Sequence, residues 1–135
     1  MRFELKNDLA EMSTLAEQLE MFGEQSGLGP EIVSVLNLAL KEIVTNIITY
    51  GYSGLPGDPR IRIELVHDGR HVTARVEDDA VAFDPLQKEE PNLDVPLEER
   101  RVGGLGIHLV KTLMDEVAYS RENNHNVLVI RKATA

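Results

Sequence analysis

The sequence contains no cysteine, which excludes disulfides, thiolate catalysis and cysteine-ligated metal. It also has no tryptophan, and aromatic residues make up only 4% of it, so a platform for stacking nucleic-acid bases is not expected. Basic residues are scarce: 14 lysines and arginines stand against 23 aspartates and glutamates, a net charge of −9. Because nucleic acid and anionic membranes both require a basic surface, neither is expected as a partner.

Long apolar runs are missing as well. No such run approaches the roughly 18 residues of a membrane-spanning helix, and the start of the chain, MRFELKNDLAEM, lacks the apolar core of a signal peptide. The 135 residues suffice for one domain with a single core and are too few for two. We therefore expect a single cytoplasmic domain spanning residues 1–135.

The spacing of apolar residues predicts the order of the elements. The predicted strands cover residues 3–5, 61–65, 72–76, 117–121 and 126–131. The predicted helices cover residues 8–22, 31–50 and 105–114, and Gly23 and Gly27 are expected to bracket the end of the first. Asp68-Gly69 predicts a hairpin turn between two strands. This order predicts an α/β (α+β) fold, a two-layer sandwich with helices on one face of a mostly antiparallel sheet.

Two polar residues interrupt the apolar face of the helix predicted over residues 31–50. Asn46 falls inside the apolar arc, and Glu42 lies on its edge one turn earlier. A buried polar group costs about 1–3 kcal/mol unless it is hydrogen-bonded or lines a cavity. The i, i+4 spacing places both side chains on one face, where they can act on one ligand. The pair indicates either a binding site or a helix-edge glutamate beside a buried, hydrogen-bonded asparagine.

Two later stretches carry further candidates. Asp78 ends a strand, where a carboxylate can accept a hydrogen bond from an exocyclic amine, although aspartate is also common in turns. Residues 85–102 have three prolines and no sustained period, which predicts a long lid or binding loop. Gly103, Gly104 and Gly106 then open a helix, whose free backbone N–H groups and positive dipole end suit phosphate; structural glycines are the alternative.

Taken in this order, the three features resemble the boxes of the GHKL ATP-binding fold. The segments that carry the resemblance are Glu42-Ile43-Val44-Thr45-Asn46, Asp78, and Gly103-Gly104-Leu105-Gly106-Ile107. Within that superfamily the chain is most similar to the anti-sigma-factor serine/threonine kinases of the RsbW and SpoIIAB type.

The resemblance implies a role for each matched residue. Glu42 is then the catalytic base, Asn46 coordinates Mg²⁺, and Asp78 binds the adenine amino group of ATP. The third box, Gly103, Gly104, Leu105, Gly106 and Ile107, closes on the phosphates. Phe83 belongs to an ending, Phe83-Asp84-Pro85, that this subgroup often shows. Ala80 replaces an expected glycine, and its methyl group fits beside the base only if φ is negative.

The resemblance also implies partners. The substrate is then a STAS-domain anti-anti-sigma protein, and the second partner is a sigma factor. Whether the protein forms a homodimer is left open. A non-catalytic, ATP-dependent binding module is the alternative. The catalytic domain of a histidine kinase would need a phosphoacceptor histidine on a dimerising helix, and none of His67, His71, His108 and His125 fits that requirement.

Overall fold

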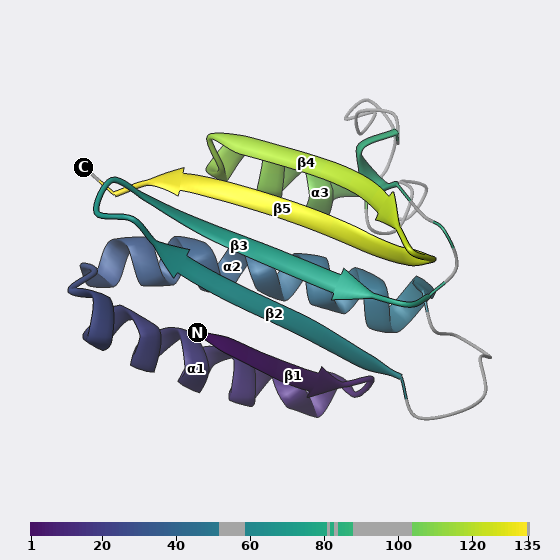
Figure 1. The fold of residues 1–135 in the computed structure, drawn as a ribbon, viewed down its shortest axis with the longest axis horizontal. Coiled ribbons are helices and arrows are strands. Elements are labelled where there is room, and N and C mark those ends of the chain that lie inside the picture. The colour runs from purple at the N-terminus through teal and green to yellow at the C-terminus, as the bar shows by residue number, and fades with distance from the viewer. Residues whose placement is uncertain (52–58, 81, 83, 88–103, 135) are drawn as a thin grey trace.

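A computed structural model describes residues 1–51, 59–80, 82, 84–87 and 104–134 (Figure 1). Its strands are β1 (Arg2–Lys6), β2 (Arg60–His67), β3 (His71–Asp78), β4 (Glu116–Glu122) and β5 (His125–Ala133). Its helices are α1 (Met12–Ser26), α2 (Pro30–Asn46) and α3 (Gly104–Leu113). The short helical segments are η1 (Leu9–Glu11), η2 (Ile47–Gly51) and η3 (Pro85–Gln87). The predicted order of strands and helices is confirmed.

The strands form one antiparallel sheet in the order β1-β2-β3-β5-β4. Figure 1 shows all three helices on one face of this sheet, with α2 between α1 and α3. The other face of the sheet is not covered by any described element (Figure 1). The predicted two-layer sandwich is confirmed.

Period-two alternation directs one set of strand residues towards the helices. In β3 the buried residues are Val72, Ala74 and Val76, and Asp78 is the next residue of that set. Ile63 of β2 pairs with Val76, and Leu128 of β5 pairs with Val76 from the other side. Asp78 therefore points into the helix-covered layer because of its position in the strand.

The central helix α2 supplies the largest helical part of the core. Its buried residues, Leu36, Ala39, Leu40, Ile43 and Val44, follow the predicted apolar arc. Pro30 occupies its first turn, where the missing N–H costs nothing. By length and composition Pro30–Thr49 could cross a membrane, but core helices of other proteins pass the same test, and these five residues are buried against the rest of this fold.

The helix predicted to reach residue 50 ends as an α-helix at Asn46 and continues as the π-helical turn η2. Ile47, Ile48 and Thr49 are all β-branched, and crowding at Cβ disfavours a regular α-helical turn. Single π-helical turns occur frequently at functional sites.

Three described turns depend on backbone with positive φ, and one of them is the β2–β3 hairpin, where Gly69 has φ 93°. Gly27 has φ 69° and ends α1, as predicted. In the turn between β4 and β5, Asn123 and Asn124 have φ 51° and 64°, so two asparagines provide the left-handed conformations that glycine usually supplies there. The end of α1 at Ser26 lies between Gly23 and Gly27, as predicted, and Gly23 itself lies inside the helix.

Gly23 sits where α1 and α2 come closest. A Cβ atom at this position would lie 2.5 Å from Cγ2 of Val33 in α2, which is well inside contact distance. Valine in a helix has one strongly preferred rotamer, so it cannot turn aside. The helix pair therefore needs glycine here for its packing.

We expect Gly23→Ala to lower the free energy of unfolding by about 1–2 kcal/mol, because the overpacking outweighs the better helix propensity of alanine. In a Val33→Ala background the same substitution should instead stabilise the protein, by up to about 1 kcal/mol, since only the propensity difference remains. Urea denaturation of the four proteins measures both effects. A Gly23→Ala change of the same sign in the two backgrounds would contradict the steric explanation.

Candidate functional site

A pocket lies beside the C-terminal end of α2, where the helix layer meets β3, β5 and β4. The residues that line it are Ile43, Asn46, Ile47, Asp78, Ala80, Pro85, Ile107, Tyr119, Asn126 and Leu128. Most of these side chains are apolar, and the polar ones are an aspartate, two asparagines and a tyrosine. Apolar walls with a few convergent polar groups are typical of a site for a small organic ligand.

Asp78 is the buried acid of this pocket, with only 4% of its surface exposed. Its Oδ1 accepts two hydrogen bonds, from the backbone N–H of Ala80 and from Nδ2 of Asn126, each at 3.0 Å. Burial raises the pKa of the Asp78 carboxyl above its ordinary value, against the smaller lowering effect of these two hydrogen bonds. Asp78 is thus a desolvated acceptor, and its environment favours a ligand that donates to it.

A second polar residue, Asn126, holds Asp78 in place from the neighbouring strand. The two residues pair directly across β3 and β5. The Tyr119 hydroxyl donates to Oδ1 of Asn126, which directs the Nδ2 donors of the amide towards Asp78 and, at 3.5 Å, the carbonyl of Ala80. Arg121 also donates to the Ala80 carbonyl, at 3.0 Å. The series of hydrogen bonds from Tyr119 through Asn126 to Asp78 fixes the orientation of the Asp78 carboxylate.

Neither Asn126 nor Tyr119 was among the residues predicted from the sequence. One signal for Asn126 was available: it is polar, yet it lies in a strand whose next residues, Val127-Leu128-Val129-Ile130, are apolar. A polar residue at a core-facing strand position needs a partner or a cavity, by the same reasoning that selected Asn46. Tyr119 gave no comparable signal.

Ala80 meets the condition of negative φ that its methyl group imposes. It is buried, with 2% exposure, and it is not among the residues with positive φ. Its N–H donates to Asp78 and its carbonyl accepts from Arg121. The methyl group is therefore accommodated without backbone strain, as negative φ allows.

Glu42 and Asn46 occupy different places at the end of α2. Asn46 is half-buried and lines the pocket, whereas Glu42 does not line it. The Glu42 carboxylate instead lies against the first turn of α3, where a Cβ on Gly106 would be 2.6 Å from Glu42 Oε2. Glycine at position 106 therefore leaves the space that the Glu42 carboxylate occupies.

The pocket brings together residues from all three matched segments. Asn46 comes from the first, Asp78 from the second and Ile107 from the third. The backbone of Gly104 and Leu105 begins α3. Phe83, Gly103 and residues 88–102 of the predicted lid lie outside the described residues. At the start of that segment, η3 is capped by Asp84, whose Oδ1 accepts from the N–H of Leu86 at 2.9 Å.

The polar groups of the pocket fit the Mg²⁺ that the family resemblance implies. Within the described ranges no three histidine, aspartate or glutamate side chains cluster as a metal site. Asn46 makes no side-chain hydrogen bond to another described residue and stays open to the pocket. Mg²⁺ takes few protein ligands and completes its octahedron with phosphate oxygens and water, so one asparagine oxygen fits its chemistry.

We expect Asp78→Asn to raise the melting temperature of the nucleotide-free protein by about 2–4 °C at pH 7. The native state holds the Asp78 proton more firmly than the unfolded chain, so stability is lost as pH rises through the interval between the ordinary and the raised pKa. Asparagine avoids this cost and can still accept both hydrogen bonds. Circular dichroism melts in a pH series should show the difference narrowing as pH falls.

Asp79→Asn is the matched control, because it removes a neighbouring but exposed carboxylate. It should leave the melting temperature close to that of the unmodified protein across the series. If Asp78→Asn melts no higher than the parent at neutral pH, the carboxylate is not destabilised by burial.

The comparisons with known proteins agree with this geometry. A family model described as the histidine kinase-like ATPase domain matches residues 5–132. The serine/threonine-protein kinase BtrW of Bordetella bronchiseptica is 30% identical over 101 residues, which cover 74% of this chain and 70% of BtrW. The serine-protein kinase RsbW of Listeria monocytogenes is 27% identical over 117 residues, 84% of this chain and 74% of RsbW.

Solved structures support the fold. The histidine kinase domain of the blue-light activated kinase EL346 from Erythrobacter litoralis aligns with a TM-score of 0.55 at 16% identity, over 93% of this chain and 60% of that one. The histidine kinase AdeS of Acinetobacter baumannii gives 0.53 at 14% identity, over 98% and 68%. Together with the sequence relatives, these matches confirm the resemblance predicted from the three segments.

Proposed function

The chain belongs to the histidine kinase-like ATPase domain family, and we propose that within it the protein is an ATP-dependent serine/threonine kinase of the anti-sigma-factor type. One observation carries the proposal: residues from three separate segments, Asn46, Asp78 and Ile107, line one pocket. The names of BtrW and RsbW, both protein kinases, support the activity. We expect it in the cytoplasm, where ATP is available.

In this proposal Asp78 recognises adenine. The carboxylate is buried, and its Oδ1 already receives two donors from the protein. The remaining acceptor capacity of the group suits the exocyclic amine of adenine, because a desolvated carboxylate gains most from a donor that replaces water. Ile43, Ile47 and Leu128 supply apolar contact for the ring. Guanine carries a carbonyl in place of that amine and would face the carboxylate with an acceptor.

The phosphates extend from this pocket towards Asn46 and the start of α3. Mg²⁺, when bound there, neutralises phosphate oxygens. Asn46 offers its side-chain oxygen as the metal ligand. Gly104 and Leu105 begin α3, whose N-terminal N–H groups favour anionic groups.

In this proposal Glu42 acts on the attacking group. In the transfer step the serine or threonine oxygen forms a bond to the γ-phosphorus, the bond from that phosphorus to the bridging oxygen of ADP breaks, and Glu42 takes the hydroxyl proton. The position of Glu42 beside Gly106, outside the pocket lining, separates it from the base-binding part of the site. The same separation leaves Glu42 free to meet a protein hydroxyl.

The protein substrate is, in this proposal, a STAS-domain anti-anti-sigma protein, and the protein also sequesters a sigma factor. The names of the kinase relatives support a serine or threonine as the acceptor, and the class of substrate follows from the resemblance of the three segments. A non-catalytic ATP-dependent binding module is the competing function, and the Glu42 experiment below distinguishes it from a kinase.

We expect Asp78→Asn to weaken ATP binding by about 10- to 150-fold, the effect of losing a hydrogen bond to a charged group. The new amide can donate, so the preference for ATP over GTP should shrink as well. Isothermal calorimetry with both nucleotides measures the two effects.

The exposed neighbour again supplies the control: Asp79→Asn makes the same change in charge and should leave ATP affinity and selectivity in place. Equal ATP affinity of the parent and Asp78→Asn would remove Asp78 from base recognition.

Glu42→Gln and Asn46→Ala should affect different steps. Glu42→Gln keeps the shape of the side chain and should bind ATP normally, while phosphoryl transfer falls by about 10²–10⁴ as expected for a lost general base. Asn46→Ala should weaken Mg²⁺-dependent ATP binding, because it removes the proposed metal ligand. Nucleotide affinity and single-turnover transfer from γ-labelled ATP to the STAS protein encoded nearby are measured on the same preparations.

Glu31→Gln, at the exposed start of the same helix, is the matched control and should transfer at the parental rate. Wild-type transfer by Glu42→Gln would show that Glu42 is not the base. If the parent protein never transfers phosphate to its STAS partner, the binding module replaces the kinase.

A further inference from the structure

A groove runs between α1 and α2, and it is separate from the nucleotide pocket. Its lining residues are Ala16, Glu20, Gly23, Glu24, Leu28, Pro30, Val33, Ser34 and Asn37. The lining residues on α2 lie in the first half of that helix, whereas the nucleotide pocket takes Ile43, Asn46 and Ile47 from the end of the helix and beyond it. The α1 side, residues 16–24, extends over about 12 Å, the length of roughly two helical turns.

The segment of the chain that forms this groove carries only acidic charged residues. Between Asp8 and Leu40 there are six acidic residues and no basic one, so this quarter of the chain supplies six of the nine net negative charges. Glu17, Glu20 and Glu24 of α1 follow one another at spacings of three and four, which stacks like charges on one side of the helix. Among the described residues, none of the three forms an ion pair. Like charges at this spacing destabilise the helix.

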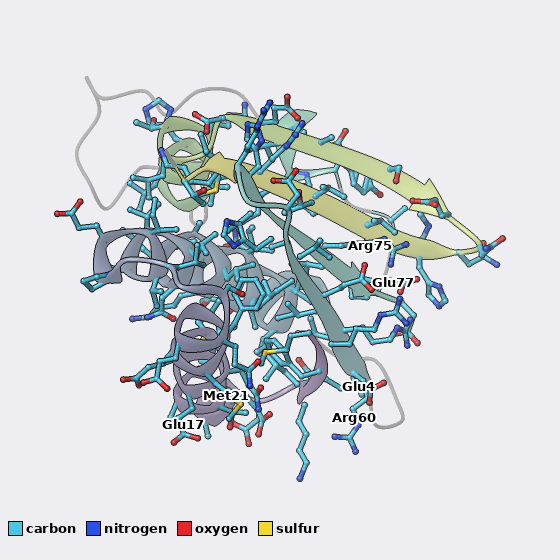
Figure 2. The ribbon with its side chains drawn as sticks, turned by 60° about the vertical axis from the view of Figure 1, so that its left-hand side comes forward. Glu4, Glu17, Met21, Arg60, Arg75 and Glu77 are labelled. Carbon is cyan, nitrogen blue, oxygen red and sulfur yellow. The ribbon has the colours of Figure 1, made fainter. Side chains whose placement is uncertain are left out.

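The opposite face of the molecule shows the contrast. On the uncovered face of the sheet, Glu77 pairs with Arg62 and Arg75, each at 3.2 Å, and Glu64 pairs with Arg2. Figure 2 shows Glu17 and Met21 projecting from α1 on the far side of the molecule from Arg75 and Glu77. Glu64 and Glu77 of the sheet thus have basic partners, whereas Glu17, Glu20 and Glu24 form no ion pair with another described residue.

Exposed apolar side chains accompany the acidic ones. Met21 on α1 is 46% exposed and Leu38 on α2 is 41% exposed. Each is adjacent in sequence to a residue that lines the groove, Glu20 and Asn37. Inside the groove, Ala16, Leu28 and Val33 are apolar. Gly23, which has no side chain, allows α1 and α2 to approach closely there. The groove thus has an apolar floor and an acidic rim. The exposed apolar side chains of Met21 and Leu38 follow lining residues in the sequence.

We propose that this groove is the docking site for a basic amphipathic helix of a partner protein. A groove between two helices accepts the apolar face of a third helix, and the acidic rim pairs with the lysines and arginines beside that face. The same charge repels nucleic acid, anionic membrane and the corresponding face of a second copy. The inference does not depend on the kinase proposal, and its test requires no nucleotide.

The probe is a fluorescein-labelled peptide of about 15 residues, with leucines at i, i+3, i+4 and i+7 and lysines elsewhere, long enough for some helicity. A second peptide has the same composition with the leucines placed on all sides. Fluorescence anisotropy with the full chain at physiological ionic strength should show saturable binding of the amphipathic peptide, at least about 10-fold tighter than binding of the shuffled one.

Two pairs of charge reversals locate the binding. Glu20→Lys/Glu24→Lys should weaken binding of the amphipathic peptide about 10-fold or more. Glu116→Lys/Glu122→Lys makes the same change in net charge on the exposed strand β4 and should have an effect of less than about 3-fold. Circular dichroism melts confirm that each variant is folded.

Two pairs of apolar substitutions provide the second readout. Met21→Ser/Leu38→Ser should weaken binding, whereas Leu9→Ser/Val66→Ser removes side chains of similar exposure, 52% and 50%, elsewhere and should not. The proposal is overturned by the absence of saturable binding, by equal affinity for the two peptides, or by equal effects of the two charge-reversal pairs. The last two results would indicate only nonspecific attraction to an acidic protein.

Discussion

The hydrogen bond between Asp78 and Asn126 across strands β3 and β5 is the interaction on which the site depends. Both residues occupy core-facing positions, and antiparallel pairing brings them opposite each other. A buried carboxylate without partners would carry the full desolvation penalty, so the donors from Asn126 and Ala80 make an acid tolerable in this layer. The remaining pocket residues surround this pair and supply apolar contact.

The helices and strands could be predicted because their signals are local. Alternation of apolar residues predicted β2 and β3, and helical spacing predicted α1 and α2. Asp78 and Asn46 could be selected because each is polar in an apolar pattern. Regular helical spacing predicted a helix to residue 50 and missed the π-helical turn η2, although its β-branched residues stand in the sequence. The close approach of Gly23 to Val33 depends on how α1 packs against α2.

The partner of Asp78 could not be predicted, for a different reason. Asn126 follows it by 48 residues, and the register that pairs β3 with β5 is set by the packed sheet rather than by any turn between them. Tyr119 adds a further step, since its role depends on β4 lying beside β5. Separations of this kind limit sequence reasoning to the individual residues of a site and leave out their contacts.

The position of β5 in the sheet also has a consequence during synthesis. β5 lies between β3 and β4, so β3 keeps an open edge until the ribosome has made residues 125–133. During that interval the backbone of β3 can pair with another chain, and Asp78 lacks the side-chain amide of Asn126. A nascent chain that stalls before Asn126 therefore presents an aggregation-prone edge, and its pocket lacks the lining residues Asn126 and Leu128.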